Sequence, residues 1–203
     1  MKTILSLFDH SGNWSQPYRE NGYNVIQVDI EHGDDIMTYD YKSIGPVYGI
    51  LAAPPCTHMS ASGAVWWPAK DRDGRTADHI RLYVKVFDII ADLSPQFWVL
   101  ENPSGRLPKF FPKLGRPWYF HPCDFGDAYT KKTGLWGNFI PPLPLFVGHQ
   151  AVAPIDNPDP RHHSIDHYMI NVKKVKSVGF EARAEWRSKT PLGFAYAFYE
   201  VNK

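Results

Sequence analysis

The sequence predicts an α/β fold with a mostly parallel central sheet, helices on both faces and a small loop-rich insertion. Apolar runs of strand length alternate with stretches of helix length over the first half of the chain. Each run closes on a polar or chemically reactive residue, and ligands of parallel sheets bind at that edge. From about residue 104 to 165 prolines are frequent and helical periodicity is lost, which indicates loops and short antiparallel strands.

Four apolar segments are expected to form buried parallel strands: residues 3–8, 23–29, 47–53 and 97–101. A helix is expected over roughly 14–21. Residues 76–93 have the strongest helical periodicity, and their apolar positions predict the face that packs on the sheet. These positions are Ile80, Val84, Phe87, Ile90 and Ala91.

The second half is expected to add short antiparallel strands at 118–124 and 133–139 and a last helix over 190–201. Thr190 suits the N-cap of that helix, and Pro191 suits its first position. The length of 203 residues predicts one domain, 1–203, with a reduced loop-rich region at about 137–187. The last helix is expected to pack back near the first strand.

Composition excludes several classes of protein. The net charge of +1 gives no global field for nucleic acid, although basic residues can still gather locally. Two cysteines cannot make a disulfide framework or a four-cysteine zinc site, and His162 and His163 have no third ligand spaced nearby, so no metal is expected. No apolar run approaches the ~18 residues that span a bilayer, and no signal peptide is recognised. We expect a cytoplasmic protein in a bacterial or phage-infected cell, without membrane association.

Cys56 is the first candidate for chemistry. It follows Pro54-Pro55 at the end of a buried strand, and the two prolines hold the thiol on a stiff loop above the sheet edge. A nucleophilic cysteine needs such a placement, together with positive charge or a helix N-terminus that lowers its pKa. The alternative is a small buried apolar residue, as most free cysteines are.

Glu101 is the second candidate, because it ends the apolar strand 97–101 and precedes Asn102-Pro103. An acid there points into the same cleft as Cys56. Partial burial raises the pKa of a carboxyl group and makes it a proton donor to a ring nitrogen. The alternative is a carboxylate that caps a neighbouring loop.

The turn at residues 9–13, between a strand and a helix, is suited to a nucleotide-like ligand. It has one glycine and is not a phosphate loop. Asp29, an acid at the end of the second strand some 20 residues later, suits a hydrogen bond to a ribose. Adenosine binding without a phosphate site favours S-adenosylmethionine over a dinucleotide.

Taken in order, these motifs resemble the cytosine-5 DNA methyltransferases, in particular their compact phage and prophage type. The motifs are Leu7-Phe8-Asp9-His10-Ser11-Gly12, Val28-Asp29-Ile30, Gly33-Asp34-Asp35-Ile36, Ala53-Pro54-Pro55-Cys56, Leu100-Glu101-Asn102-Pro103 and the C-terminal residues 190–202. Pro-Pro-Cys followed about 45 residues later by Glu-Asn-Pro is the most specific part. The resemblance covers nearly the whole chain and implies a Rossmann-like S-adenosylmethionine-dependent methyltransferase fold.

The resemblance implies S-adenosylmethionine as cofactor. Asp29 would bind the ribose hydroxyls, while Asp35 and Ile36 would meet the adenine. The implied cofactor-binding residues are Phe8, Asp9, His10, Ser11, Gly12, Asp29, Ile30, Asp35, Ile36 and Pro54. His10 stands where the family usually has glycine, close to the expected methionine carboxylate.

The resemblance also implies the chemistry. Cys56 would add to carbon 6 of cytosine and Glu101 would hold or protonate ring nitrogen 3, with Lys132 as a third catalytic residue on a strand that bears arginine in the family. DNA would be the partner, as a duplex from which the cytosine is flipped. The implied substrate-binding residues are Pro55, Ser60, Trp66, Trp67, Arg75, Asn102, Lys131 and Thr133.

Several readings stay open. The 57–75 segment, with its Trp66-Trp67 pair, is either a flap that closes over the base or a surface loop packed on the core. The region 137–187 is too small for a separate recognition domain, which predicts short or lax sequence discrimination, or a homodimer that supplies it. The alternatives to cytosine-5 transfer are modification of another pyrimidine, in RNA or as a nucleotide, use of a modified donor, and a catalytically silent nucleic-acid- or partner-binding protein.

Overall fold

A computed structural model describes residues 1–144, 163–164 and 187–203, and its centre is a six-stranded sheet in the order β2-β1-β3-β4-β7-β5. Four neighbouring strands are parallel: β2 (Asn24–Val28), β1 (Thr3–Leu7), β3 (Gly49–Ala52) and β4 (Phe97–Pro103). Antiparallel to β4 runs β7 (Thr133–Asn138), which pairs in turn with β5 (Trp118–Phe120). The predicted α/β class and mostly parallel sheet are confirmed.

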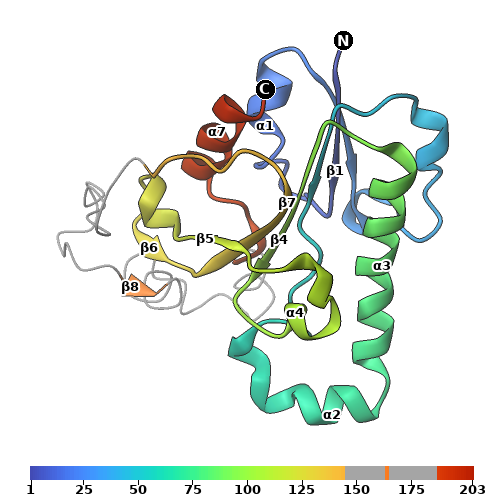
Figure 1. The fold of residues 1–203 in the computed structure, drawn as a ribbon, viewed down its shortest axis with the longest axis vertical. Helices are drawn as coiled ribbons and strands as arrows, with labels where there is room; N and C mark the ends of the chain where they lie inside the picture. The colour runs from blue at the N-terminus through green and yellow to red at the C-terminus, as the bar shows by residue number, and fades with distance from the viewer. Residues whose placement is uncertain (145–162, 165–186) are drawn as a thin grey trace.

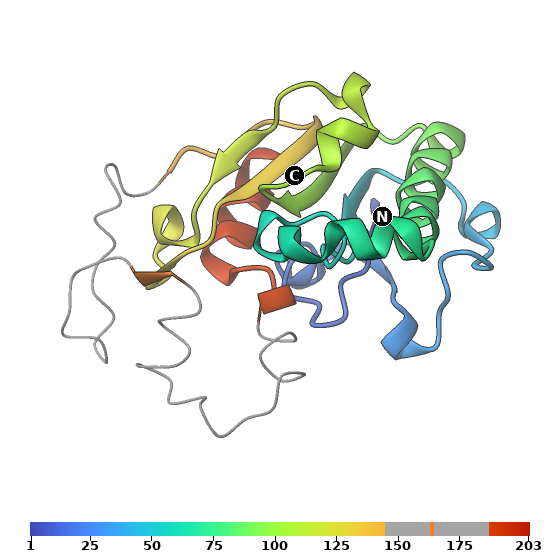
Figure 2. The same ribbon diagram turned by 90° about the horizontal axis from the view of Figure 1, so that it is seen from below.

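Helices cover both faces of this sheet. On one face lies α3 (Arg75–Leu93), and on the other lie α1 (Gln16–Glu20) and α7 (Leu192–Val201) (Figures 1 and 2). Because side chains alternate along a strand, Leu5 of β1 packs in one core cluster with Tyr83, whereas Ile4 packs in the other with Tyr18 and Phe198. Both termini lie at one end of the molecule, opposite α2 (Trp67–Arg72) (Figure 1).

The predicted strands all exist, but their ends differ from the expected ones. Strand β1 stops at Leu7 because Phe8 has a φ of 60°, outside the extended region. Strand β4 continues past Glu101 to Pro103 because β7 pairs with it along this length. The last helix begins at Leu192, with Pro191 at its N-cap and no side-chain capping bond, so the N-cap expected at Thr190 is wrong.

The buried face of α3 also differs from the predicted one. The residues that face the sheet are Thr76, His79, Tyr83, Val86 and Ile89. Val84 is exposed instead, and Ile80 and Phe87 pack only at the margin of the core. The apolar pattern predicts the wrong face of α3, because the face that is buried carries the polar side chains of His79 and Tyr83. Both side chains are satisfied there by hydrogen bonds to the loop after β3.

The remaining described segments are short. They comprise η1 (Ile30–His32), η2 (Tyr41–Ile44), η3 (Ala61–Trp66), α4 (Leu107–Phe110), η4 (Pro112–Leu114), η5 (Pro122–Phe125), β6 (Tyr129–Thr130) and β8 (His163–Ser164). Most of the expected recognition region, and His162 with it, lies outside the described residues. Within the described part no three His, Cys, Asp or Glu side chains are grouped as a metal site. No helix among those described is long and apolar enough to cross a bilayer.

Candidate active site

The candidate site lies at the carboxyl ends of the neighbouring strands β3 and β4. These strands are paired in register, with Ala52 opposite Leu100. Cys56 follows Ala52 by four residues on the loop after β3, and Glu101 follows Leu100 directly. The strand register therefore brings the two candidate groups to the same edge of the sheet.

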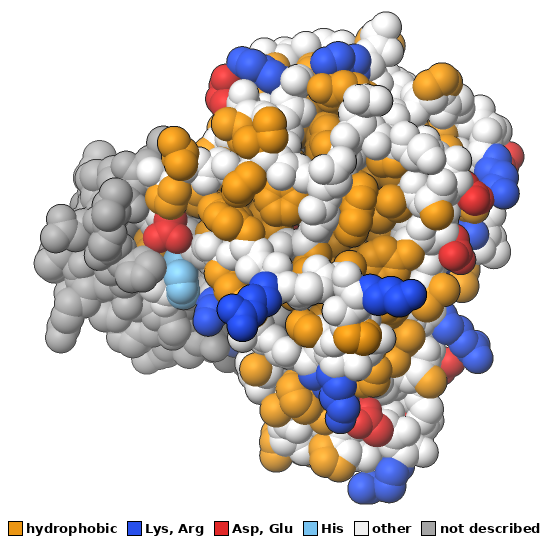
Figure 3. All heavy atoms as spheres, viewed as in Figure 1, with side chains coloured by type: hydrophobic (Ala, Val, Ile, Leu, Met, Phe, Trp, Pro, Cys, Tyr) orange, Lys and Arg blue, Asp and Glu red, His pale blue; other side chains and the backbone are white. Residues whose placement is uncertain are grey.

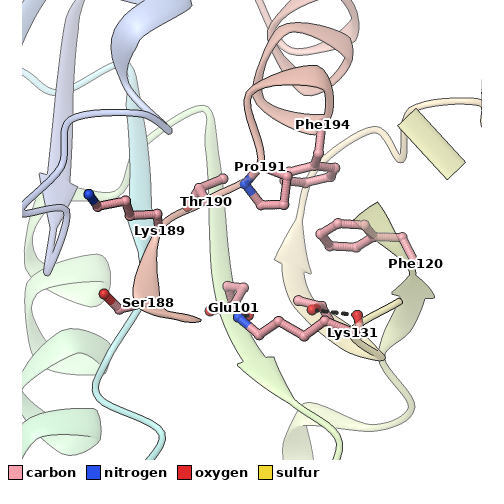
Figure 4. Close-up of a pocket in the computed structure, with 9 residues that line it drawn as sticks. Glu101, Phe120, Lys131, Ser188, Lys189, Thr190, Pro191 and Phe194 are labelled. Atoms are coloured by element: carbon pink, nitrogen blue, oxygen red, sulfur yellow. Dashed lines mark hydrogen bonds and ion pairs between the residues drawn. The ribbon is translucent and has the colours of Figure 1, made fainter. Parts of the chain in front are cut away.

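Lys131 completes this group. Its Nζ lies 3.9 Å from Oε1 of Glu101, and the two side chains are only 18% and 16% exposed. The same ammonium donates to the carbonyl of Arg187 at 2.9 Å. Figure 4 shows Glu101 and Lys131 side by side below the segment that leads into α7. The pocket there is lined by Glu101, Phe120, Lys131, Thr133, Ser188, Lys189, Thr190, Pro191 and Phe194.

Burial sets the protonation of both candidate groups. It raises the pKa of Glu101, and the nearby Lys131 opposes this only in part, so the carboxyl is suited to donate a proton. Burial also raises the pKa of the Cys56 thiol, against the opposing charge of Lys131, while Glu101 raises it further. Arg187 and the Cys56 backbone N–H favour the thiolate. The lowered thiol pKa expected of a nucleophile is thus not found, and the raised pKa favours the neutral thiol of Cys56.

The loop that holds Cys56 is fixed by hydrogen bonds to its backbone. The carbonyl of Cys56 accepts from the backbone N–H groups of Met59 and Ser60, both at 2.9 Å. One residue further on, Lys70 donates to the carbonyl of Thr57 at 2.8 Å. The thiol therefore stands on an ordered turn.

Arg106 joins this loop to the 57–75 segment and to α3. Its buried guanidinium donates to the carbonyl of His58 at 2.8 Å, to Asp71 at 2.8 Å and to the hydroxyl of Thr76 at 2.9 Å. It also lies 4.6 Å from the centroid of a Trp67 ring. Sequence reasoning missed Arg106, and its position three residues after Pro103 was the only available signal.

Two further residues missed from the sequence, His79 and Tyr83, reach the loop from α3. Both donate to the carbonyl of Pro55, the residue before Cys56. Asn102 in turn donates to the Tyr83 hydroxyl at 2.7 Å, so its amide is directed into the protein. A signal was present in the i, i+4 spacing of two amphipathic side chains on one helix.

The proposed cofactor end is formed by the turns after β1 and β2. Phe8 and Gly12 have positive φ angles of 60° and 69° and shape the first turn. Asp29 is buried and accepts from the backbone N–H of Glu31 at 3.0 Å, and the adjoining Ile30 is 65% exposed. An uncovered apolar side chain beside an acid fits the adenine and ribose of S-adenosylmethionine.

Other residues expected at the cofactor have different surroundings. The carboxylate of Asp9 is turned inward, where it accepts from Ser6 at 2.9 Å and from the side chain and backbone of Ser15 at 2.8 and 3.1 Å. All three bonds end on Oδ2 of Asp9, and they hold the first turn in place. Ile36 is likewise buried in the core. His10 is exposed and its ring lies 5.2 Å from that of His32.

Three more of the expected cofactor-binding residues lie on or near these turns. Ser11 accepts from the backbone N–H of Asn13 at 3.3 Å. Asp35 is exposed and accepts from the N–H of Met37 at 2.9 Å. Pro54, before Pro55, is buried.

The two tryptophans of the 57–75 segment differ in exposure. Trp66 is 64% exposed, whereas Trp67 packs under Arg106. Arg75 donates to Asp73 at 2.8 Å, and the Ser60 hydroxyl bonds that of Ser62 at 2.9 Å. Of the expected substrate-binding residues in this segment, Trp66 and Arg75 are exposed, whereas Ser60 and Trp67 are partly buried.

The two lysines that precede β7 differ in their surroundings. The family resemblance places Lys132 among the catalytic residues and Lys131 among the substrate-binding ones. Lys131 lies beside Glu101, whereas the exposed Lys132 extends over the ring of Tyr119 at 4.5 Å from its centroid. Thr133 is buried and donates to the carbonyl of Lys131 at 3.0 Å. Lys131, and not Lys132, is therefore the lysine that lies beside Glu101.

A mostly parallel sheet with a thiol and a carboxyl at its carboxyl edge, and an acid at the end of its second strand, defines an α/β protein of the methyltransferase class. The chain belongs to the C-5 cytosine-specific DNA methylase family, whose model matches residues 7–108. A comparison with curated protein sequences gave no match.

Two solved structures are similar to this chain. One, from E. coli, is described as a DNA modification methyltransferase encoded within a prophage; it is 18% identical with a TM-score of 0.50 over 68% of this chain and 47% of its own. The other, the Dnmt2 methyltransferase of S. pombe, is 12% identical with a TM-score of 0.41 over 88% of this chain and 56% of its own. This chain thus spans about half the length of either protein, and the first likeness supports the fold.

Proposed function

We propose that this protein transfers a methyl group from S-adenosylmethionine to carbon 5 of cytosine in DNA. The observation that supports this is the joint placement of a thiol, a buried carboxyl and a buried ammonium at the ends of β3, β4 and β7. A metal-free attack on a pyrimidine ring needs a nucleophile on carbon 6 and an acid at nitrogen 3. Cys56 and Glu101 are suited to these two roles.

The chemistry follows from the protonation states. Cys56 gives its proton to water as its sulfur bonds carbon 6, and Glu101, with its raised pKa, donates a proton to nitrogen 3, so electron density moves to carbon 5. Asp29 and Ile30 would hold S-adenosylmethionine, which would supply the methyl group to carbon 5 and leave as S-adenosylhomocysteine. Carbon 5 then gives its proton to water and the carbon–sulfur bond breaks. The Cys56 thiolate regains a proton from water, and the proton on nitrogen 3 returns to Glu101. Lys131 is placed to bind the oxygen of the base.

The proposed substrate is a DNA duplex with the target base flipped out, because a stacked ring exposes neither carbon 6 nor nitrogen 3 to a protein thiol. The exposed ring of Trp66 offers a stacking surface. Figure 3 shows Lys and Arg side chains across the lower half of one face, near α2 and α4, where phosphates would be attracted.

The test is incubation of the protein with labelled S-adenosylmethionine and a duplex that contains 5-fluorocytosine. The fluorine cannot leave as a proton does, so the expected result is a covalent protein–DNA adduct that maps to Cys56. Cys56→Ala should abolish the adduct and keep cofactor binding. Cys123→Ala, at the buried second cysteine, should leave the adduct unchanged. An adduct that persists in Cys56→Ala contradicts the proposal.

A matched pair of variants separates the two lysines. Lys131→Ala should slow transfer strongly because it removes the only charge that pairs with Glu101 within the described residues. Lys132→Ala should have little effect, since its side chain lies over Tyr119. The reverse order would restore the assignment of Lys132 made from the sequence.

The same experiment tests the alternatives. An adduct with 5-fluoropyrimidine RNA and none with DNA would favour the RNA substrate, and cofactor binding without any adduct would favour a silent protein. We further propose short or lax sequence discrimination, supplied by the region 137–187 or by a second copy of the chain. Bisulfite sequencing of DNA from expressing cells tests this, and a long strict recognition sequence would contradict it.

A further inference from the structure

The peptide unit between Pro55 and Cys56 is held from outside its own loop. Its carbonyl oxygen accepts from Nε2 of His79 and from the hydroxyl of Tyr83, the latter at 3.2 Å. A trans peptide is planar, with its C=O and N–H on opposite sides. Holding the carbonyl toward α3 therefore fixes the direction of the Cys56 N–H, and that N–H favours the Cys56 thiolate.

Tyr83 also couples this peptide to β4. Its hydroxyl is fully buried and accepts from the Asn102 amide at 2.7 Å while it donates to Pro55. Asn102 directly follows Glu101 on the strand. One phenol hydroxyl thus joins the loop of the thiol to the strand of the acid.

The protonation of both α3 side chains fits this arrangement. Burial raises the pKa of Tyr83 well above its usual value, and Cys56 and Glu101 raise it further, so the phenol stays a donor. Burial lowers the pKa of His79 to about 4, so the imidazole is neutral. Because a carbonyl oxygen only accepts, Nε2 of His79 bears the hydrogen.

We propose that Tyr83 and His79 are positioning residues that set the orientation of the Cys56 thiol relative to Glu101. They hold the thiol through the Pro55 carbonyl and the Asn102 amide and do not touch the base. Their importance for methyl transfer rests on the proposed function, whereas their effect on the thiol does not.

The test is the rate at which iodoacetamide alkylates Cys56, followed by peptide mass spectrometry as a function of pH. Tyr83→Phe keeps the ring in the core and removes the hydroxyl. We expect the profile to move to higher pH and alkylation near neutral pH to slow by about fivefold, the effect of one lost hydrogen bond. The matched control is Tyr41→Phe, in the same core cluster, whose hydroxyl bonds Asp92 at the far end of α3. Its profile should overlay that of the unaltered protein.

His79 provides an independent pair of variants. His79→Gln retains an N–H donor for the Pro55 carbonyl and should preserve the profile, whereas His79→Ala should shift it as Tyr83→Phe does. In the methyl-transfer assay the shifted variants should lose kcat with an unchanged KM for the cofactor. Circular dichroism identifies any variant that fails to fold. If Tyr83→Phe fails to fold, the comparison of His79→Gln with His79→Ala still tests the positioning role.

The outcomes separate the two proposals. If folded Tyr83→Phe and His79→Ala both alkylate like Tyr41→Phe, the positioning role is overturned. If their profiles shift while the unaltered protein transfers no methyl group to DNA, the positioning role stands and the proposed function fails.

Discussion

Arg106→Ala should remove the contacts that join the Cys56 loop to the 57–75 segment and to α3. It removes one buried cation that contacts the carbonyl of His58, the carboxylate of Asp71 and the hydroxyl of Thr76. It also uncovers the ring of Trp67. The change therefore acts on the thiol loop, the 57–75 segment and the first turn of α3 together.

The magnitude follows from what each partner loses. Each of the three hydrogen bonds contributes roughly 1 kcal/mol net, more where the donor is charged. Asp71 is about half exposed and regains water, whereas Thr76 is buried and loses the Arg106 donor. We expect the free energy of unfolding to fall by about 3 kcal/mol, which lowers Tm by about 9 °C in a domain of this size.

Thermal unfolding followed by circular dichroism measures this change. The matched control is Arg75→Ala, an exposed arginine of the neighbouring segment that pairs with Asp73. Exposed ion pairs contribute at most about 1 kcal/mol, so its Tm should fall only slightly. If Arg106→Ala lowers Tm no more than Arg75→Ala does, the reasoning on the buried guanidinium is refuted.

Two further predictions concern packing and protonation. Gly105→Ala should lower Tm strongly, because the added Cβ would lie 1.9 Å from the carbonyl oxygen of Met59. The control is Gly63→Ala, whose added Cβ would have its nearest atom at 3.6 Å. Equal Tm values for the two variants would contradict the prediction. Asp127→Asn should stabilise the protein at high pH, because burial raises the pKa of Asp127 to about 6. The protonated Asp127 contributes fully to the free energy of unfolding below the usual acid pKa, and this contribution is lost as pH rises through about 6. The Tm difference between variant and unaltered protein should grow from about pH 4 to about pH 7, and a constant difference would exclude this cause.

The strands and the thiol and acid motifs could be predicted because local sequence determines them. Apolar runs closed by Pro54-Pro55 and by Asn102-Pro103 leave little choice of where the strands end. The direction of a side chain is not local in this way. Lys131 and Lys132 are equivalent in sequence, and only the pairing of β7 with β4 decides which one meets Glu101.

The buried face of α3 escaped prediction for a related reason. Periodicity counts apolar residues, whereas His79 and Tyr83 are buried because distant groups satisfy their polar atoms. Asp9 is a second example: its sequence position in a turn does not reveal that Ser6 and Ser15 both donate to its Oδ2. Tertiary hydrogen bonds decide both cases.

The bond from Lys131 to the carbonyl of Arg187 ties together two points that are 56 positions apart along the chain. Lys131 lines the pocket that contains Glu101, and so does Ser188, which directly follows Arg187, so both ends of the intervening sequence lie at this pocket. With its ends pinned, such a stretch changes length at little entropic cost, because loop closure depends only weakly on length. A change in the length of the sequence between the two bonded residues therefore need not separate Lys131 from Glu101.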